Sequence, residues 1–234
     1  MNGQTHTPGQ LPFQSAWWAF DLGRYRPCDS TYCRYEYDSL PPVPPVSESL
    51  DWLEPLDAAT DARMAIHRNP AEAGGKVKNL QDLVTQSQLT LPKSFVTLME
   101  SPELQDRIPS CTACYFSLSD TVLPCPASDS GYIVRFYNDQ QDVLRWYLYL
   151  TPGGDQYVLV TPIALDELAA NTLSDENRLS VRRNTWVCAH SFTEFIYRWY
   201  IENSIWFKVS EANDEDKLTD AERAYLAHYH PSGQ

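Results

Sequence analysis

Residues 191–207 read SFTEFIYRWYIENSIWF, and seven of these seventeen residues are Phe, Tyr or Trp. Ser191 and Glu194 match a capping box, in which the hydroxyl accepts a hydrogen bond from a first-turn amide and the carboxylate reaches back to the helix start. Aromatic residues at helical spacing are usually packing rather than a ligand site. We therefore predict a capped helix that buries one wide apolar face, formed by Phe192, Phe195, Ile196, Trp199 and Tyr200.

The other side of this predicted helix is expected to lie away from the core. It carries Glu194, Tyr197, Arg198 and Ile201. Downstream, the segment SIWFKV (204–209) is predicted to leave the helix as an extended edge or a loop.

Upstream of the helix, apolar residues alternate with a period of two, which indicates strands. The segments are CTACYFSL (111–118), GYIVRFYN (131–138), DVLRWYLYL (142–150) and QYVLVTPI (156–163). The short polar connections between the last three are typical of hairpins, so we predict an antiparallel meander. In the third strand, alternation directs Leu144, Trp146, Leu148 and Leu150 to the core, and Val143, Arg145, Tyr147 and Tyr149 to solvent or a partner.

Three shorter helices are predicted before the sheet, in NLQDLVTQSQ (79–88), LPKSFVTLME (91–100) and SPELQDRI (101–108). Asn79 and Ser101 are suitable caps, and Pro92 suits a first helical position. The expected apolar faces hold Leu80, Leu83 and Val84 in the first helix, and Phe95, Leu98 and Met99 in the second. The predicted fold class is therefore α+β, with an antiparallel β-sheet (a meander) flanked by α-helices.

The two ends of the chain differ from this body. Residues 1–75 mix aromatic residues with the proline-rich run LPPVPPV (40–46), and we predict an N-terminal arm that packs on the body because exposed Trp17 and Trp18 would be a liability. The stretch NPAEAGGKV (69–77) reads as a linker into the domain, residues 76–210. Residues 211–234 form an acidic tail with a short helix, capped by Thr219 and Glu222, and we expect the domain to keep its stability without them.

The six cysteines occupy positions 28, 33, 111, 114, 125 and 188. The start of the chain has no signal-peptide pattern, and no segment approaches the ~20 apolar residues of a membrane span. We therefore predict a cytoplasmic protein with reduced cysteines. Cys111 and Cys114 form a CxxC, but on a strand they would face opposite sides, which favours packing over a zinc site.

No catalytic motif is recognisable, whether a GxSxG elbow, an HExxH, a P-loop or a GxGxxG after a strand. Cys188 and His190 are the nearest approach to a nucleophile and base, and we expect both to be structural. The sequence thus predicts no catalytic, cofactor-binding or metal site.

Charge limits the class of partner. The chain has 18 Lys and Arg against 31 Asp and Glu, a formal net charge of −13. This composition argues against non-specific nucleic-acid binding and against anionic membrane surfaces. An acidic surface suits a basic protein partner, although the same charge also serves solubility alone.

Four segments in order, LPKSFVTLM (91–99), CYFSLSDTVLPCP (114–126), the hairpins of 130–162 and VCAHSFTEFIYRWYIENSIWF (187–207), resemble the SUKH superfamily in its Smi/Knr-like branch. This superfamily joins bacterial toxin-immunity proteins with a fungal regulator of cell-wall synthesis. The resemblance is most specific in the Leu-Pro-x-x-Phe helix start and the aromatic helix, and covers residues 76–210. It implies an α+β domain with an antiparallel sheet, no catalysis, and binding to proteins, commonly as an antidote to a toxic effector domain.

We therefore expect a non-enzymatic protein-binding domain, most concretely a bacterial immunity protein that covers a toxin's active site with an acidic surface. Two alternatives stay open: a regulatory scaffold or adaptor with several protein partners, and an enzyme with an unrecognised site. The oligomeric state and the identity of the partner also stay open. The candidate contact residues are Asp139 and Asp142 in a hairpin loop, Arg145 and Tyr147 on the sheet, and Glu194 and Glu202 on the aromatic helix.

Overall fold

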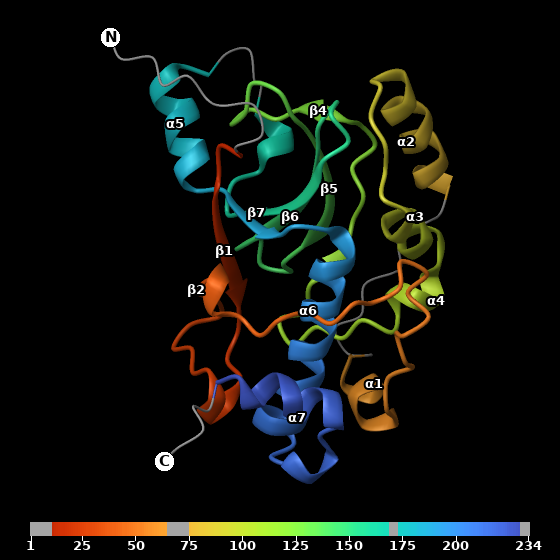
Figure 1. Cartoon of the computed structure of the whole chain (residues 1–234), viewed down its shortest axis with the longest axis vertical. Helices are drawn as coiled ribbons and strands as arrows, with labels where there is room; N and C mark the ends of the chain where they lie inside the picture. Colours follow the sequence, from red (N-terminus) through yellow and green to blue (C-terminus); the bar gives the residue numbers. More distant parts are fainter. Residues whose placement is uncertain (1–10, 65–74, 169–172, 230–234) are drawn as a thin grey trace.

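The structure is a computed structural model that describes residues 11–64, 75–168 and 173–229. Within these residues the fold is α+β, with an open mixed sheet of eight strands and seven α-helices (Figure 1). The strands are β1 (Gln14–Ala19), β2 (Cys33–Glu36), β3 (Tyr115–Phe116), β4 (Leu123–Pro124), β5 (Tyr132–Asn138), β6 (Arg145–Leu150), β7 (Gln156–Thr161) and β8 (Trp186–Ala189). The helices are α1 (Ala58–Met64), α2 (Gly75–Gln86), α3 (Lys93–Glu100), α4 (Pro102–Gln105), α5 (Asp175–Arg183), α6 (Phe192–Trp206) and α7 (Asp220–Ala227).

The sheet runs in the order β2-β1-β8-β7-β6-β5-β3, with β4 pairing on β5. The neighbours from β5 through β8 are antiparallel, with Leu148 opposite Val134 on one side and Val158 on the other. β1, however, lies parallel to β8, with Gln14 opposite Trp186. The prediction of a purely antiparallel sheet is therefore wrong, because a strand from the N-terminal segment inserts beside the last strand of the body.

The predicted strand at 111–118 is shorter in the structure. Ala113 has φ 55°, in the left-handed region that ends extended structure, and only Tyr115–Phe116 pairs with β5. Cys111 and Cys114 lie in the turn before β3, so the argument that a strand separates their side chains does not apply.

Helices cover both faces of the sheet. In Figure 1, α2 and α3 lie on one side of the strands and α5 on the other. Leu148 and Trp146 belong to the larger core beneath α2, α3 and α6, as predicted. Tyr147 and Tyr149 belong to a second core with Val181 of α5, so the prediction that these two side chains meet solvent or a partner is wrong, whereas Val143 is exposed as predicted. This face of β6 is buried because α5 and the segment around Cys125 pack over it. Neither segment was identified as part of a core from the sequence.

The central aromatic helix α6 begins as predicted at Ser191, whose hydroxyl accepts from the Glu194 amide at 3.1 Å. The Glu194 carboxylate reaches back one residue further than a capping box requires, to the amide of His190 at 2.9 Å. The predicted apolar stripe is buried apart from Tyr200, which is half-buried. Arg198 and Ile201 are also buried, so the exposed face expected for them is wrong.

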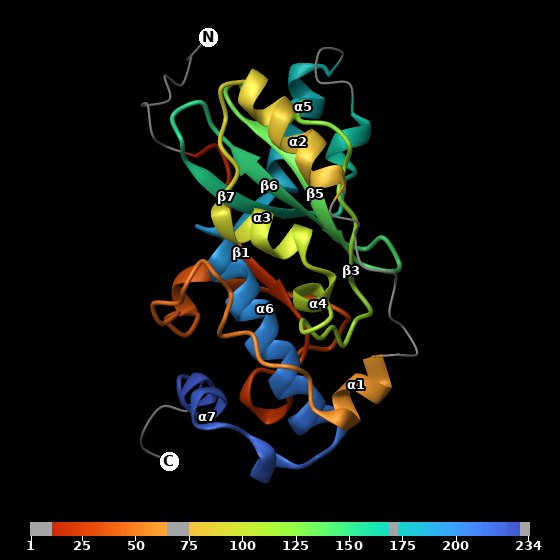
Figure 2. The same cartoon turned by 90° about the vertical axis from the view of Figure 1, so that its right-hand side faces the viewer.

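The helix does not end in an extended segment either. It continues to Trp206 and then into a π-helical turn, Phe207–Glu211, which holds Lys208 and Val209 in helical geometry. Figure 2 shows that the chain around residues 40–57 crosses the helix and that α7 lies at its far end, so much of its outer side is covered.

The N-terminal segment is part of the sheet and the core. Trp17 is fully buried, with its ring 6.3 Å from that of Trp199, and the ring of Trp18 packs at a tilt against Trp186, 4.9 Å away. Both tryptophans thus lie against rings of the body. The domain boundaries at 75 and 210 stay predictions, and the predicted linker at 69–77 falls largely outside the described residues.

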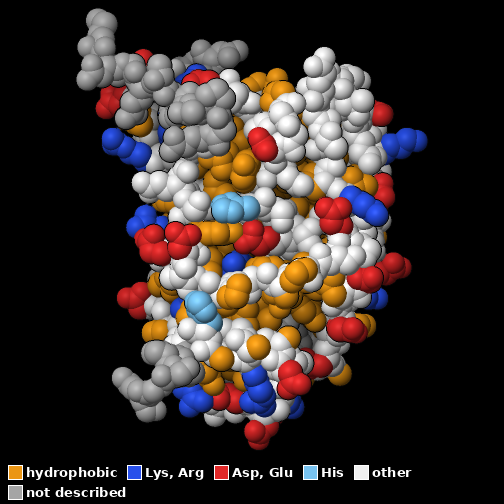
Figure 3. Space-filling model, viewed as in Figure 1, with side chains coloured by type: hydrophobic (Ala, Val, Ile, Leu, Met, Phe, Trp, Pro, Cys, Tyr) orange, Lys and Arg blue, Asp and Glu red, His pale blue; other side chains and the backbone are white. Residues whose placement is uncertain are grey.

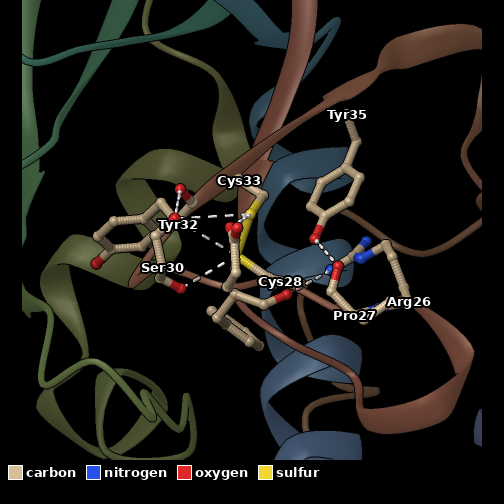
Figure 4. Close-up of a disulfide and its surroundings, with 9 residues drawn as sticks. Arg26, Pro27, Cys28, Ser30, Tyr32, Cys33 and Tyr35 are labelled. Carbon is tan, nitrogen blue, oxygen red and sulfur yellow. Dashed lines mark hydrogen bonds between the residues drawn. A yellow bond between two sulfur atoms is a disulfide. The ribbon is translucent and has the colours of Figure 1, made fainter.

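The link between β1 and β2 contains a disulfide between Cys28 and Cys33 (Figure 4). Tyr32, within the closed loop, is buried and hydrogen-bonds toward the interior, whereas both cysteines are only half-buried. The expectation that all six cysteines are reduced is wrong for this pair, because the hairpin brings their Cα atoms within 5.8 Å, a normal span for a disulfide. The other four cysteines are free.

The acidic tail docks on the body. The predicted capping box of Thr219 and Glu222 is present and starts α7, whose Tyr225 and Leu226 are buried. Lys208 donates to both oxygens of Glu222 at 2.7 and 2.8 Å, joining α7 to the π-helical turn. These contacts argue against the expectation that the tail is dispensable for stability.

Within the described part of the chain, none of the helices is both long and apolar enough to cross a membrane.

Replacing Trp199 by alanine is expected to lower the free energy of unfolding by about 3–5 kcal/mol, the usual cost of removing a large aromatic side chain from a core. The indole is fully buried and donates to the Tyr137 hydroxyl at 2.9 Å. Urea unfolding measures the change, and Leu179→Ala, at a side chain 44% exposed, is the control with an expected change under about 0.5 kcal/mol. A loss below about 1 kcal/mol for Trp199→Ala would show that the helix is not central to the core.

Reduction of the Cys28–Cys33 disulfide is expected to cost about 2 kcal/mol of stability, the loop-closure value for so short a separation. The double variant Cys28→Ser, Cys33→Ser should match the reduced wild-type protein in thermal melts, with no further response to reductant. If reductant lowers the melting temperature of the double variant as well, the effect does not come from this disulfide.

Candidate functional site

The six side chains predicted to touch a partner do not form one surface. Asp139 is buried and organises the β5–β6 loop, where its carboxylate accepts from the amides of Gln141 and Val143 at 2.8 and 3.2 Å. It also accepts from the Tyr32 hydroxyl at 2.6 Å, which ties the disulfide loop to this hairpin. The expectation that Asp139 is an exposed hairpin acid is wrong, because the loop folds around its carboxylate.

Asp142 and Arg145 lie together at the same hairpin. Asp142 is 66% exposed and forms an ion pair with Arg145 at 3.2 Å. The Arg145 guanidinium also donates to the carbonyl of Pro162 at 3.1 Å, so this side chain is largely committed within the fold. A contact role for either residue stays a prediction.

Tyr147 points into the second core instead of toward a partner. Its hydroxyl donates to Asp166 at 2.7 Å and accepts from the amide of Leu165 at 3.0 Å. Burial, together with the nearby Asp166 carboxylate, raises the pKa of Tyr147 above its usual value, so the hydroxyl stays protonated.

Glu194 is partly buried at the start of α6, beside a hollow of about 390 Å³. Its carboxylate accepts from the Tyr37 hydroxyl and the His190 amide, and it lies 3.4 Å from Arg198. The Tyr37 ring stacks on His190 at 4.7 Å. Since these contacts occupy both oxygens of Glu194, the hollow offers little free polar chemistry to a ligand.

Glu202 is fully buried at the centre of α6 and accepts four hydrogen bonds. The Arg26 guanidinium donates to both carboxylate oxygens at 2.6 and 2.7 Å, while Trp17 donates at 2.9 Å and Tyr225 at 2.6 Å. Although burial works against the charge, the Glu202 carboxylate raises the pKa of Arg26 above its usual value. The expectation that Glu202 faces solvent is wrong, because β1, the β1–β2 link and α7 converge on it.

The site that remains is a groove in the lower half of the face shown in Figure 3, where hydrophobic side chains gather. It has a volume of about 610 Å³, within the range of small-molecule and peptide pockets. Three segments form it: residues 52–60 of the N-terminal arm, α6 with its π-helical extension, and the start of the tail. We call it the arm–tail groove.

Three aromatic rings form the wall of the groove nearest α6. The Trp52 ring lies 5.6 Å from that of Tyr197 and 6.0 Å from that of Tyr200, and all three are half-buried. The Trp52 indole is held in place, since its N–H donates to the carbonyl of Ser47 at 3.0 Å. Ile201, which is buried, completes the apolar floor.

Charged groups surround these rings. Glu54 and Asp57 are exposed residues of the arm that line the groove. Burial opposes the charge of Asp57, but hydrogen bonds from the Thr60 hydroxyl and from first-turn amides of α1 dominate and lower its pKa, so it is ionised at neutral pH. The two lysines of the groove are already paired: Lys208 with Glu222 at 2.7 Å, and Lys217 with Asp214 at 2.9 Å.

Chemistry suited to catalysis or metal binding is not evident in the described residues. No three His, Cys, Asp or Glu side chains among them are placed to hold a metal ion. Cys188 is fully buried, and burial raises the pKa of its thiol well above the usual value, with Glu194 adding to the effect. A thiol in this state is a poor nucleophile, so Cys188 and His190 do not form an activated pair.

The sequence reasoning missed the arm–tail groove. It placed Tyr197 on the exposed face of the helix and Tyr200 in the core, and it assigned no role to the segment DWLEPLD (51–57). A tryptophan close to acidic residues in an irregular segment was the available signal, because aromatic side chains are enriched at interfaces relative to the rest of a protein surface.

Comparison of the chain with protein-family models, with curated proteins and with solved structures returns no match. The resemblance to the SUKH superfamily therefore rests on the sequence segments alone and stays a prediction.

Glu202→Gln is expected to destabilise the protein by about 3–5 kcal/mol, because it leaves the buried Arg26 guanidinium without a counter-charge. The matched control is Asp142→Asn, which breaks an ion pair on the exposed side of a hairpin and should cost less than about 1 kcal/mol. Chemical denaturation of both variants gives the comparison. Equal losses in the two variants would rule out a special contribution from the buried pair.

Proposed function

We propose that this protein is a non-enzymatic protein-binding domain that docks a basic segment of its partner in the arm–tail groove. The observation that carries the proposal is the groove itself, in which an apolar, aromatic floor lies beside the carboxylates of Glu54 and Asp57. Interfaces concentrate their binding energy in such aromatic pockets, and charge complementarity selects the partner and speeds encounter.

The charge of the chain supports a basic partner. At a net charge of −13, the protein repels anionic surfaces and attracts cationic ones over a distance of about 10 Å at ordinary salt. The acids near the groove belong to the arm and the tail. Those that line it are Glu54 and Asp57 of the arm and Glu222 of the tail, which is paired with Lys208.

The most concrete form of the proposal is an immunity-type protein that occupies the active site of a toxic effector. The support for this form is the SUKH-like sequence segments and the carboxylates of Glu54 and Asp57 in the groove. A nuclease toxin would present a basic phosphate-binding surface that matches it. A bacterial source and a cytoplasmic location belong to the same proposal, and the disulfide weighs against the location because disulfides persist mainly in oxidising compartments.

The adaptor alternative loses part of its basis. One form of it uses the proline-rich run as a ligand for other domains, but the carbonyl of Pro41 accepts a hydrogen bond from Arg198 at 2.7 Å, and Leu40 is buried. The start of this run is thus fixed to α6 rather than free to bind as an extended peptide.

The test is affinity capture from the native host with immobilised wild-type protein, with a Trp52→Ala, Tyr197→Ala groove variant, and with Asp82→Asn as a control on exposed α2. We expect a basic protein that the wild type and the control retain and the groove variant loses. Its affinity should fall at least about threefold when salt rises from about 50 to 500 mM, since screening acts on exposed charges.

Co-expression of the two proteins tests whether this protein neutralises its partner. The captured protein should be toxic when produced alone and harmless when produced with the wild type. Equal retention by the groove variant, with its melt unchanged, would place the interface elsewhere, and salt-independent binding would contradict an acidic docking surface.

A further inference from the structure

The arrangement of rings and carboxylates in the arm–tail groove points to a more specific ligand than a basic surface. Trp52, Tyr197 and Tyr200 present adjoining aromatic walls, and the nearby acids belong to the same short segment as Trp52. We infer that the groove binds an arginine side chain of the partner, with the guanidinium against an aromatic face and paired with Glu54 or Asp57. This inference rests on the proposed function and names the group recognised.

The first support is that the groove places aromatic rings, whose faces carry partial negative charge, beside negatively charged carboxylates. A cation placed over Trp or Tyr is attracted by the ring quadrupole, and the attraction grows when the site is partly desolvated. Arg26 already uses this chemistry within the fold, with its guanidinium carbon 4.3 Å from the centre of the Tyr35 ring while it pairs with Glu202. The arm–tail groove offers the same two components without an arginine of its own.

The second support is the balance of charge at the groove. Lys208 and Lys217 line the groove, but both are already paired: Lys208 with Glu222, and Lys217 with Asp214. Among the described residues, Glu54 has no ion-pair partner. Asp57 accepts hydrogen bonds from the hydroxyl and amides at the start of α1, and Lys208 and Lys217 act on it only from beyond ion-pair distance. An incoming cation would therefore supply the ion-pair partner that the Glu54 carboxylate lacks.

The third support is the rigidity of the arm at Trp52. Leu50, two residues before Trp52, and Leu53, directly after it, are fully buried, and Arg107 donates to the carbonyl of Leu53 at 2.8 Å. Leu50 adopts φ 60°, a conformation that costs a leucine free energy and persists only where the surroundings impose it. The strained turn sets the Trp52 ring against α6 before any partner arrives, which lowers the entropy lost on binding.

Arginine fits better than lysine because its guanidinium is planar. It stacks on a ring and presents a fork of donors to a carboxylate at the same time, whereas an ammonium is a compact and more strongly hydrated charge. A neutral aliphatic anchor would gain from the apolar floor but would leave Glu54 and Asp57 without a partner.

The experiment uses the full-length protein and three blocked pentapeptides of glycine with a central arginine, citrulline or leucine. Citrulline keeps the shape of arginine and removes its charge. Binding is followed by NMR at the indole N–H of Trp52, assigned from a Trp52→Phe variant. We expect the arginine peptide to bind at least about fivefold more tightly than the citrulline or leucine peptides, as a cation–π contact predicts.

Variants test the individual groups. Glu54→Gln combined with Asp57→Asn should remove most of the preference for arginine over citrulline, while Asp82→Asn on α2 should leave it intact. Binding to the variants is followed at the same Trp52 signal. For the ring, Trp52→Leu should abolish the preference and Trp52→Phe should retain part of it, followed in both variants at the assigned tyrosine side-chain signals of Tyr197 and Tyr200.

The outcomes separate this inference from the proposed function. If all three peptides bind equally, the groove is a docking site but arginine recognition is wrong. If no peptide shifts the Trp52 signal while host capture still depends on the groove, the arginine inference fails and the proposed function stands. Arginine-selective binding that survives both Trp52→Leu and the double carboxylate variant would also overturn the inference.

Discussion

The structure depends on one buried carboxylate. Glu202, in the middle of α6, accepts hydrogen bonds from Trp17, Arg26 and Tyr225, so a strand, a connecting loop and the tail helix all meet at one fully desolvated charge. An unpaired carboxylate at this depth would be very costly, whereas a saturated one tolerates only a single arrangement of its donors. This contact joins both ends of the described chain to the central helix.

The arm–tail groove follows from this assembly. Its walls come from segments about 150 residues apart in sequence, and they adjoin only because the arm crosses α6 and the tail returns to it. The arm is fixed by Arg198 to the carbonyl of Pro41, and the tail by Lys208 to Glu222. The same polar contacts that stabilise the fold therefore also shape the surface that we propose to bind a partner.

Local patterns in the sequence were sufficient for local structure. The capped starts of α6 and α7, the stripe of Phe95, Leu98 and Met99, and the hairpins around β6 all follow from spacing and turn chemistry. The errors concern long-range burial. Tyr147 and Glu202 were expected at the surface. Nothing in the segment of Tyr147 reveals that α5 covers it, and nothing in the segment of Glu202 reveals that Trp17, Arg26 and Tyr225 surround it. The groove was missed for the same reason, since no single segment contains it.

The parallel pairing of β1 with β8 also bears on how the protein is made. Gln14 can find its partner Trp186 only after more than 170 further residues have been synthesised, and Glu202 acquires its last donor later still, with Tyr225. Contacts so distant in sequence slow folding, and they keep Trp17 and Trp18 without their native cover while the chain emerges from the ribosome. During synthesis, the exposed Trp17 and Trp18 therefore make the nascent chain prone to aggregation. A chaperone that binds this segment would raise the yield of folded molecules.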